Sequence, residues 1–288
     1  MVAESASAPT AQHGDHTDRV VAAFAPGDRL AVVLRAAVRH LHAFVEEVGL
    51  TPEEWMAGVR FLTEVGARCD DVRQEFILLS DVLGVSSLVE LVNVSDVQGA
   101  SPATVLGPFY VEDSPAVSQG GTIVFDPTTG GEPLAVTGTV ADLAGRPVAG
   151  ATVDVWQVQP DGRYDIEVDP GRRNLRGRLT TDDAGRFSFH TVRPVDYTIP
   201  ADGPVGSLLQ AAGRHPWRPA HLHVAVTADG YRRLVTHLFD AASAYLDSDA
   251  VFAVRDGLVT DLSGPAAHFD FVLAPAPGGP DHRSSGLC

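Results

Sequence analysis

The stretch PLAVTGTVADLAGRPVAGATVDVW, from Pro133 to Trp156, indicates which fold the chain adopts. Two segments in which apolar or β-branched residues recur at alternate positions flank a short run that contains Gly145, Arg146 and Pro147. Alternation with a period of two is typical of β-strands, and a glycine close to a proline is typical of the turn between them. We therefore predict a pair of β-strands in this stretch.

Segments of the same kind follow along the chain. They are LRGRLTT (175–181), RFSFHTV (186–192), HLHVAVT (221–227) and RRLVTHLF (232–239). Turn residues lie between them at Asp183–Gly185 and Asp229–Gly230. Successive antiparallel strands of this length favour a β-sandwich, which we place at residues 101–275. The proline- and glycine-rich residues 276–288 are expected to form a loose tail.

The chain before the sandwich has a different pattern. From Arg29 to about Asn93, apolar residues recur at helical spacing. One stripe comprises Leu30, Leu34, Val38, Leu41 and Val45, and another comprises Trp55, Val59, Leu62 and Val65. Thr51, Pro52 and Glu54 resemble a capping box with proline at the first helical position. The predicted fold is therefore α+β, with a flexible lead at residues 1–22 and a helical region at 23–100.

Composition excludes several classes of function. The formal net charge of −16 opposes binding to nucleic acid or to a membrane surface. All 21 basic residues are arginine, so no lysine can form a Schiff base or serve a phosphate-binding loop. Cys69 and Cys288 are too few for a disulfide framework or a structural zinc site, and the first twenty residues lack the basic start and apolar run typical of a signal peptide. A cytoplasmic location is expected.

Two histidines on one predicted strand suggest a metal site. His221 and His223 are two residues apart, so their side chains leave the same face with α-carbons about 7 Å apart. Both imidazoles could then reach one ion. Packed and hydrogen-bonded histidines remain the alternative, because no cysteine lies near and no third histidine lies at the helical offset found in zinc hydrolases. His215 and His237 are candidates for contact with these residues rather than with the metal.

Two tyrosines in rigid loops could complete such a site. Tyr164 follows Asp161 and Gly162, and Tyr197 lies between Pro194 and Pro200. A phenol has a pKa of about 10, so it binds as a phenolate only beside a strongly charged cation such as Fe(III). The alternative is that each tyrosine closes the edge of the sandwich, with its ring inside and its hydroxyl in water.

Four segments resemble the intradiol ring-cleavage dioxygenases, and they occur in the family's order. They are TVLGPFYVEDSP (104–115), DVWQVQPDGRYD (154–165), LRGRLTTDDAGRFSF (175–189) and GRHPWRPAHLH (213–223). The resemblance implies one Fe(III) per subunit, held by Tyr164, Tyr197, His221 and His223. It also implies that O2 and an aromatic diol or triol are the substrates. Tyr197 would act as the base that leaves the iron, and Arg218 would stabilise negative charge on the substrate.

Further stretches resemble the members of the family that cleave hydroxyquinol, more than those that cleave catechol or chlorocatechol. They are LLSDVLGVSSLVELVN (78–93), YTIPADGPVG (197–206) and the long segment at 230–259. Leu78 and Asp81 are one helical turn apart, so Leu78 could contact the ring while Asp81 accepts a hydrogen bond from a third hydroxyl. Asp81 could instead satisfy backbone donors at a helix end. The other positions that match the family's pocket are Val105, Gly107, Pro108, Ile199, Pro200 and Val251. Thr198 departs from the family, where proline is usual.

The resemblance also implies that the helical region at 23–100 is a dimerisation domain that encloses a tunnel able to hold a lipid. Two other classes of function remain open from the residues. The Pro133–Trp156 stretch also suits a transthyretin-like binding module without catalysis. His221 and His223 could serve a zinc hydrolase, although that enzyme would need a carboxylate ligand and a general base.

Overall fold

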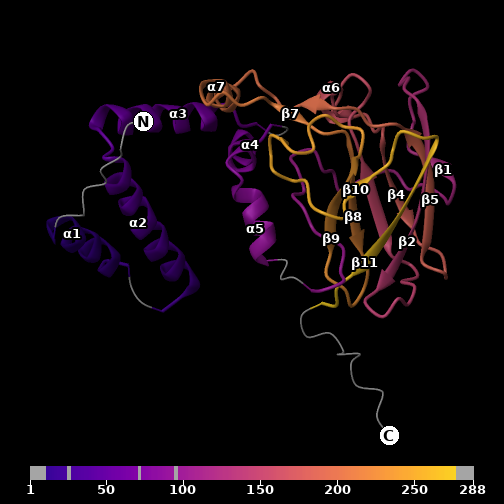
Figure 1. The fold of residues 1–288 in the computed structure, drawn as a ribbon, viewed down its shortest axis with the longest axis horizontal. Helices are drawn as coiled ribbons and strands as arrows, with labels where there is room; N and C mark the ends of the chain where they lie inside the picture. The colour runs from indigo at the N-terminus through magenta and orange to yellow at the C-terminus, as the bar shows by residue number, and fades with distance from the viewer. Residues whose placement is uncertain (1–10, 25–26, 71–72, 94–96, 277–288) are drawn as a thin grey trace, which may run out of the picture. The chain divides into compact units, whose positions relative to one another are not determined.

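The structure is a computed structural model that describes residues 11–24, 27–70, 73–93 and 97–276. The chain forms two compact units, Met1–Glu64 and Val65–Cys288. Figure 1 shows the order of the elements along the chain. The tail expected at 276–288 lies outside the described residues apart from Ala276, as do the first ten residues of the expected lead.

The first unit is helical, as the spacing of its apolar residues predicts. It contains α1 (Ala11–Ala22), α2 (Arg29–Val48) and most of α3 (Pro52–Ala67). Asp28 caps α2, because its carboxylate accepts from Ala31 N at 2.8 Å. The capping box before α3 is confirmed by hydrogen bonds between Thr51 and Glu54 in both directions.

Residues 11–22 form α1 where the sequence suggested a flexible lead. The reason is tertiary contact with the next helix: the side chain of Thr17 is hydrogen-bonded to His42 Nδ1 at 2.8 Å, and the ring of His16 stacks on that of His42. Short helices are marginal alone and depend on such packing.

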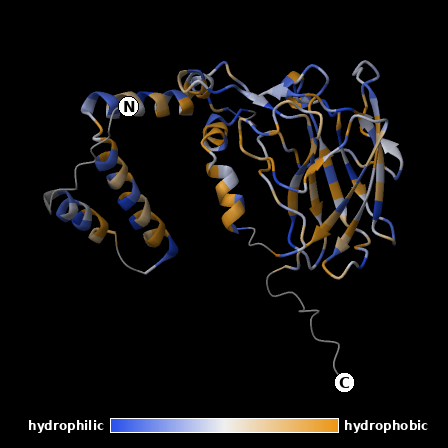
Figure 2. Cartoon of the chain, in the orientation of Figure 1, coloured by the Kyte–Doolittle hydropathy of each residue, from blue (hydrophilic) through white to orange (hydrophobic). Residues whose placement is uncertain are grey.

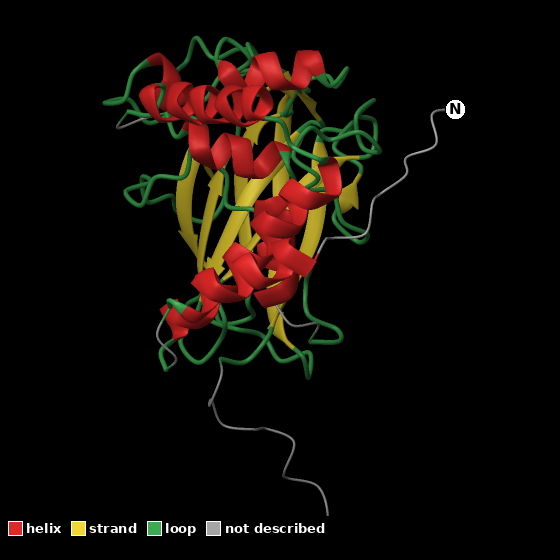
Figure 3. Ribbon diagram, turned by 90° about the vertical axis from the view of Figure 1, so that its left-hand side faces the viewer, coloured by secondary structure: helices red, strands yellow, loops and turns green. Residues whose placement is uncertain are grey.

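The second unit contains four shorter helices and all the strands. The helices are α4 (Glu75–Val82), α5 (Val85–Asn93), α6 (Asp165–Val168) and α7 (Pro204–Ala211). None of the described helices is both long and apolar enough to cross a membrane. Figure 3 separates these helices, in red, from the yellow strands and the green loops.

The strands form two large sheets and one small one, which confirms the predicted α+β sandwich. The four-stranded sheet has the order β1-β5-β2-β11, with β1 (Gly121–Thr122), β5 (Arg186–Val192), β2 (Pro133–Asp142) and β11 (Ala266–Leu273). The five-stranded sheet has the order β10-β9-β8-β3-β4, with β10 (Val259–Thr260), β9 (Leu234–Asp240), β8 (His221–Thr227), β3 (Thr152–Trp156) and β4 (Arg176–Thr180). The small sheet pairs β6 (Tyr197–Thr198) with β7 (Trp217–Arg218).

Pairing of successive strands is only partly as expected. β3 pairs with β4 and β8 with β9, both antiparallel. In contrast, β2 and β3 lie in different sheets, and β2 pairs in parallel with β11 over eight residue positions. The sequence pattern missed β11, because six of its eight positions are exposed or partly exposed and its partner is far away in the chain.

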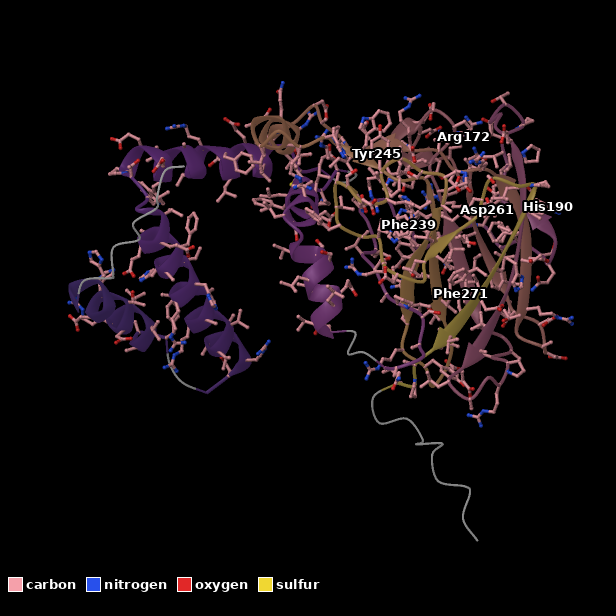
Figure 4. All side chains as sticks on the ribbon, viewed as in Figure 1. Arg172, His190, Phe239, Tyr245, Asp261 and Phe271 are labelled. Carbon is pink, nitrogen blue, oxygen red and sulfur yellow. The ribbon has the colours of Figure 1, made fainter. Side chains whose placement is uncertain are left out.

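The sandwich core lies between the two large sheets. Val153, Leu179 and Leu222 from one sheet meet Val136 and Phe271 from the other. Phe271 is labelled in Figure 4, and Figure 2 shows stretches of hydrophobic residues, in orange, along the strands. A second apolar cluster contains Trp156, Tyr164, Tyr197 and Ala225. The five-stranded sheet is therefore covered on both of its faces.

Candidate metal centre

The two histidines of β8 point away from the sandwich core. Leu222, Val224 and Val226 belong to that core, so the alternate residues His221 and His223 project from the opposite face. Loops cover this face, and both histidines are at most 2% exposed. A strand buried on both faces loses the polar and apolar alternation of a surface strand.

Two separate elements bring the tyrosines to these histidines. Tyr164 directly precedes α6, where its backbone N donates to the Glu167 carboxylate at 2.8 Å. Tyr197 lies on β6, directly opposite Arg218 of β7. The turn at Gly162 brings the two elements together, since a Cβ at that glycine would lie 3.4 Å from Tyr197 Cβ.

The four side-chain atoms converge on one point. Tyr164 Oη lies 2.7 Å from His223 Nε2 and 3.1 Å from Tyr197 Oη, and His221 Nε2 lies 3.1 Å from His223 Nε2. Ligands held about 2 Å from one ion are roughly 3 Å apart from their neighbours. Two imidazoles and two phenols spaced in this way fit a metal ion. The histidines alone also do, because ring nitrogens of His221, His223 and His237 lie within 4.8 Å of one another.

Both histidines are neutral, as a metal ligand requires. Burial is the main cause that lowers the pKa of His221 and of His223 well below the usual value, and Arg218 lowers both further. Both rings are therefore neutral at pH 7. His221 Nδ1 lies 2.6 Å from the Pro219 carbonyl, which can only accept, so Nδ1 carries the proton and Nε2 has the free lone pair.

The tyrosine hydroxyls are buried, so the alternative in which they reach water is wrong. Tyr164 is 1% exposed and Tyr197 is 5% exposed. Burial raises the pKa of both, and for Tyr164 the neighbouring Tyr197 raises it further. Neither phenol would ionise at pH 7 without a strongly charged cation beside it. This donor set therefore suits a hard cation of high charge.

Arg218 brings a fixed positive charge to the same point. It is 3% exposed, and its Nη1 donates to Tyr197 Oη at 3.2 Å and lies 3.4 Å from His221 Nε2. Asp249 accepts from Arg218 Nε at 3.1 Å and from Nη2 at 3.4 Å. This pairing, together with Tyr197, raises the pKa of Arg218 in spite of burial, so the guanidinium remains charged.

His237 and His215 differ in their relation to the centre. His237 lies opposite His223 on β9, with ring centroids 4.2 Å apart, and Thr104 is hydrogen-bonded to its Nδ1. His237 thus contacts the predicted ligands, as the sequence suggested. His215 instead accepts a hydrogen bond from Trp217 N and lies against the ring of Tyr245, which Figure 4 labels.

Close packing fixes the ring of His223. Trp156 stacks on it with centroids 4.7 Å apart. Gly107 covers its edge, where an added Cβ would lie 3.2 Å from His223 Cε1, and the glycine has φ +75°. This glycine was predicted as a pocket residue, and the structure places it against His223.

Most of the other predicted substrate residues are buried. Leu78 and Asp81 both face inward from α4, and Asp81 is hydrogen-bonded to Ser86 and interacts electrostatically with Arg218. Val105, Val251 and Ile199 are buried, whereas Pro108 and Pro200 are partly exposed. Tyr197, Ile199 and Pro200 line a cavity of about 660 Å³, whose lining does not include the remaining predicted residues.

Several residues that build the centre were missed by the sequence patterns. They are Asp249, Thr104, Trp156, and the buried ion pair between Arg176 and Asp165. Arg176 also donates to the Phe109 carbonyl, and Phe109 stacks on Tyr164. Asp249 is 31 residues from Arg218 and Thr104 is 133 from His237, so no local spacing links them. Asp165 directly follows Tyr164 in the sequence, and this adjacency could have indicated that Asp165 supports the centre.

Two models of known protein families match this chain. A model described as "Dioxygenase" matches residues 105–275, and one described as "Catechol dioxygenase N terminus" matches residues 27–101. These matches together cover the helices from α2 onward and the whole sandwich.

Individual relatives agree with the family models. The 6-chlorohydroxyquinol 1,2-dioxygenase of Cupriavidus pinatubonensis is 47% identical, over 90% of this chain and 96% of its own. A hydroxyquinol 1,2-dioxygenase of Rhodococcus opacus is 49% identical, over 85% of this chain and 82% of its own. The solved hydroxyquinol 1,2-dioxygenase of Pseudomonas putida superposes with a TM-score of 0.85 at 45% identity, covering 92% of this chain and 99% of that one. The chain therefore belongs to the intradiol ring-cleavage dioxygenases.

Proposed function

We propose that this protein binds one Fe(III) per subunit and uses O2 to cleave hydroxyquinol (1,2,4-trihydroxybenzene) between its adjacent hydroxyl carbons. The product would be 3-hydroxy-cis,cis-muconate, the enol tautomer of maleylacetate. The observation that carries this proposal is the convergence of Tyr164, Tyr197, His221 and His223, in a chain 45–49% identical to enzymes named for hydroxyquinol or its chloro derivative.

The donor set supports iron rather than zinc. Phenol oxygens and neutral imidazole nitrogens are hard and borderline ligands, and the part of the chain that the structure describes brings no cysteine or carboxylate to the four converging atoms. Bound there, Fe(III) would supply a Lewis acid that lowers the pKa of the substrate hydroxyls and a centre that can accept electron density from the ring.

Tyr197 is proposed as the base. Burial raises its pKa, while Arg218 and the hydrogen bond with Tyr164 act in the opposite direction. A buried phenolate at this position therefore has a strong tendency to take a proton from a substrate hydroxyl. Tyr164 is proposed to remain a ligand throughout, as the resemblance to the family implies, because its hydroxyl lies 2.7 Å from His223 Nε2 and Phe109 stacks on its ring.

Arg218 is proposed to stabilise negative charge that develops on the substrate. Its guanidinium is held by Asp249 and directed at Tyr197 and His221, so it needs no reorganisation when that charge appears. Such preorganised charge in a buried site is worth much more than the same charge in water.

Substrate choice is proposed to depend on α4. Leu78 would contact the ring, and Asp81 would accept a hydrogen bond from the third hydroxyl. Val105, Gly107, Pro108, Ile199, Pro200 and Val251 would line the rest of the pocket. Catechol or a chlorocatechol is the second candidate, because a catechol 1,2-dioxygenase of Candida albicans is 40% identical over 80% of this chain and 77% of its own.

The assembly is also a proposal. α2 has no buried residue, and Leu30, Leu41 and Trp55 are among the exposed apolar side chains of the helical region. These surfaces support a homodimer formed through the N-terminal helices at 23–100, and the resemblance to the family adds a bound lipid to this proposal. The net charge of −16 opposes a nucleic acid or membrane partner, and the presence of only two cysteines fits the proposed cytoplasmic location.

Oxygen uptake tests the proposed function. The iron-loaded protein is given hydroxyquinol, catechol and 4-chlorocatechol in turn, and the ring-opened products are identified by mass spectrometry. We expect the highest kcat/KM with hydroxyquinol. Faster turnover of catechol would transfer the proposal to the second candidate, and no uptake with any of the three would reject both.

A further inference from the structure

His237 has a polar atom that the proposed function does not use. The residue is fully buried on β9, and its Nε2 has no hydrogen-bond partner among the described residues. A buried donor or acceptor without a partner destabilises the fold, so native proteins retain few of them. An orphaned nitrogen beside a reaction centre therefore suggests a partner that arrives with the substrate.

Thr104 determines what kind of group this nitrogen is. Thr104 is fully buried, and among the described residues its hydroxyl has one neighbour within hydrogen-bonding distance, His237 Nδ1. The hydroxyl proton has no other acceptor, so Thr104 donates to Nδ1. A neutral imidazole that accepts at Nδ1 carries its own proton at Nε2. The orphaned atom is accordingly an N–H donor.

The hydrogen bond from Thr104 also makes the imidazole of His237 neutral, because a ring nitrogen that accepts a hydrogen bond carries no proton. Its side chain cannot therefore act as a second positive charge beside Arg218. It offers one neutral and oriented hydrogen bond.

Three aromatic rings pack against the imidazole of His237. The ring of His237 lies 4.2 Å from that of His223 and 4.7 Å from that of His221, measured between centroids. Phe239, labelled in Figure 4, stacks on its other side at 5.1 Å with an interplanar angle of 11°. A ring nitrogen of His237 lies within 4.8 Å of ring nitrogens of both other histidines. The donor therefore cannot turn toward solvent.

His237 is not needed as a metal ligand. A protonated Nε2 has no lone pair to offer, and Tyr164 already supplies an oxygen 2.7 Å from His223 Nε2. Three histidines can hold a metal in other proteins, but here the Thr104 hydrogen bond favours the tautomer that does not bind one.

We propose that His237 donates a hydrogen bond from Nε2 to an ionised oxygen of the aromatic diol or triol bound in the metal pocket, and that Thr104 is the positioning residue that holds the required tautomer. This inference rests on the proposed function for the identity of the substrate. It adds a substrate contact on the side of the centre formed by β9.

Anaerobic titration of the iron-loaded enzyme tests the inference. Hydroxyquinol is added without O2, and the Kd is read from the change in the visible spectrum. The variants are His237→Leu, which removes the donor, His237→Gln, which retains an N–H donor, Thr104→Val and Thr104→Ser. His190→Leu, at an exposed position of β5 labelled in Figure 4, is the control for the loss of a histidine. Iron content and the spectrum before titration are recorded for each.

The expected result is a rise in Kd of about 10- to 100-fold for His237→Leu, the effect of removing a hydrogen bond to a charged oxygen. His237→Gln should recover most of the affinity, Thr104→Val should fall between them, and Thr104→Ser should bind within a few-fold of the wild type. Iron content and the starting spectrum should not change, because a donor to the substrate does not hold the metal.

Two results would overturn this inference and leave the proposed function intact. One is an unchanged Kd in His237→Leu while the wild type still cleaves the diol. The other is loss of iron or an altered starting spectrum in both His237→Leu and His237→Gln, which would make His237 a metal ligand. A wild-type enzyme that neither binds nor cleaves any diol would instead reject the proposed function, and this inference with it.

Discussion

Arg218 and Asp249 form a buried ion pair beside the candidate metal centre, with Nε and Oδ1 3.1 Å apart and side chains at most 4% exposed. Asp249 also accepts from the backbone N of Val251 at 3.3 Å and of Ala253 at 3.0 Å. The carboxylate therefore joins a loop to the guanidinium that contacts Tyr197. It neutralises a charge that would otherwise be expensive to bury.

Asp249→Asn is expected to lower both activity and stability. The amide keeps the shape of the side chain but removes its charge, so Arg218 loses its ionic partner and its fixed orientation. We expect kcat/KM to fall roughly 10- to 100-fold and the free energy of unfolding to fall by about 3–5 kcal/mol. Steady-state kinetics and urea denaturation measure these effects. Asp247→Asn, an exposed position in the same loop, is the control, and equal effects of the two variants would contradict the account.

The buried pair between Arg176 and Asp165 is expected to stabilise the elements around Tyr164. Both side chains are 1% exposed, and Asp165 also accepts from Asn174 N at 3.0 Å. Asp165→Asn should lower the free energy of unfolding by about 3–5 kcal/mol. Asp161→Asn breaks the nearby exposed pair with Arg163, N to O 2.7 Å, and should cost at most about 1 kcal/mol. Urea denaturation measures the free energy of unfolding of both variants. Similar losses would show that burial of an ion pair does not change its contribution to stability.

Gly107→Ala is expected to weaken metal binding. The new Cβ would lie 3.2 Å from His223 Cε1, in a backbone conformation with φ +75°. Gly230→Ala is a matched control, because its φ is +84° but no atom lies within 4 Å of the new Cβ. Both variants should lose about 1 kcal/mol of stability from backbone strain. Gly107→Ala alone should also lose roughly tenfold in iron affinity, measured by competition with a chelator. Equal affinities in the two variants would contradict the contact with His223.

Local patterns predicted the parts of the fold that local interactions determine. The Thr51 and Glu54 cap, the turns at Gly145 and Gly185, and the strands β3 and β8 all follow from residues close in sequence. The parallel pairing of β2 with β11 could not be predicted in this way. It joins residues about 130 positions apart, such as Ala135 and Ala266, and depends on packing of the whole sandwich.

The candidate site was predictable to the same degree. The spacing of His221 and His223 gave one shared face, the loop positions of Tyr164 and Tyr197 made them candidates, and the resemblance to a family joined the four into one site. Spacing alone could not reveal that both tyrosine hydroxyls are buried, because burial depends on the loops that cover them. Nor could it reveal Asp249 or Thr104, since each reaches its partner only through the tertiary fold.

Asp81→Asn is expected to change substrate preference. The amide is a poorer acceptor for the third hydroxyl of hydroxyquinol, so KM for hydroxyquinol should rise about tenfold while that for catechol changes little. Burial raises the pKa of Asp81, opposed by Ser86 and Arg218. The protonated carboxyl therefore makes its full contribution to stability below its unfolded pKa of about 3.9. This contribution is lost as the pH rises through the raised pKa of the folded state. The variant should then be at least as stable as the wild type at pH 7. Parallel rises in KM for both substrates would remove Asp81 from this role.

Visible absorption of the iron-loaded protein tests the central claim, that Tyr164, Tyr197, His221 and His223 together hold Fe(III). Phenolate bound to Fe(III) absorbs visible light, whereas zinc phenolate does not. The account predicts a coloured wild type with one iron per chain and a changed, weakened band in Tyr164→Phe. It predicts an unchanged band in Tyr231→Phe, a partly buried tyrosine of the sandwich core. A colourless protein after loading with iron, or a band that survives unchanged in Tyr164→Phe, would contradict it.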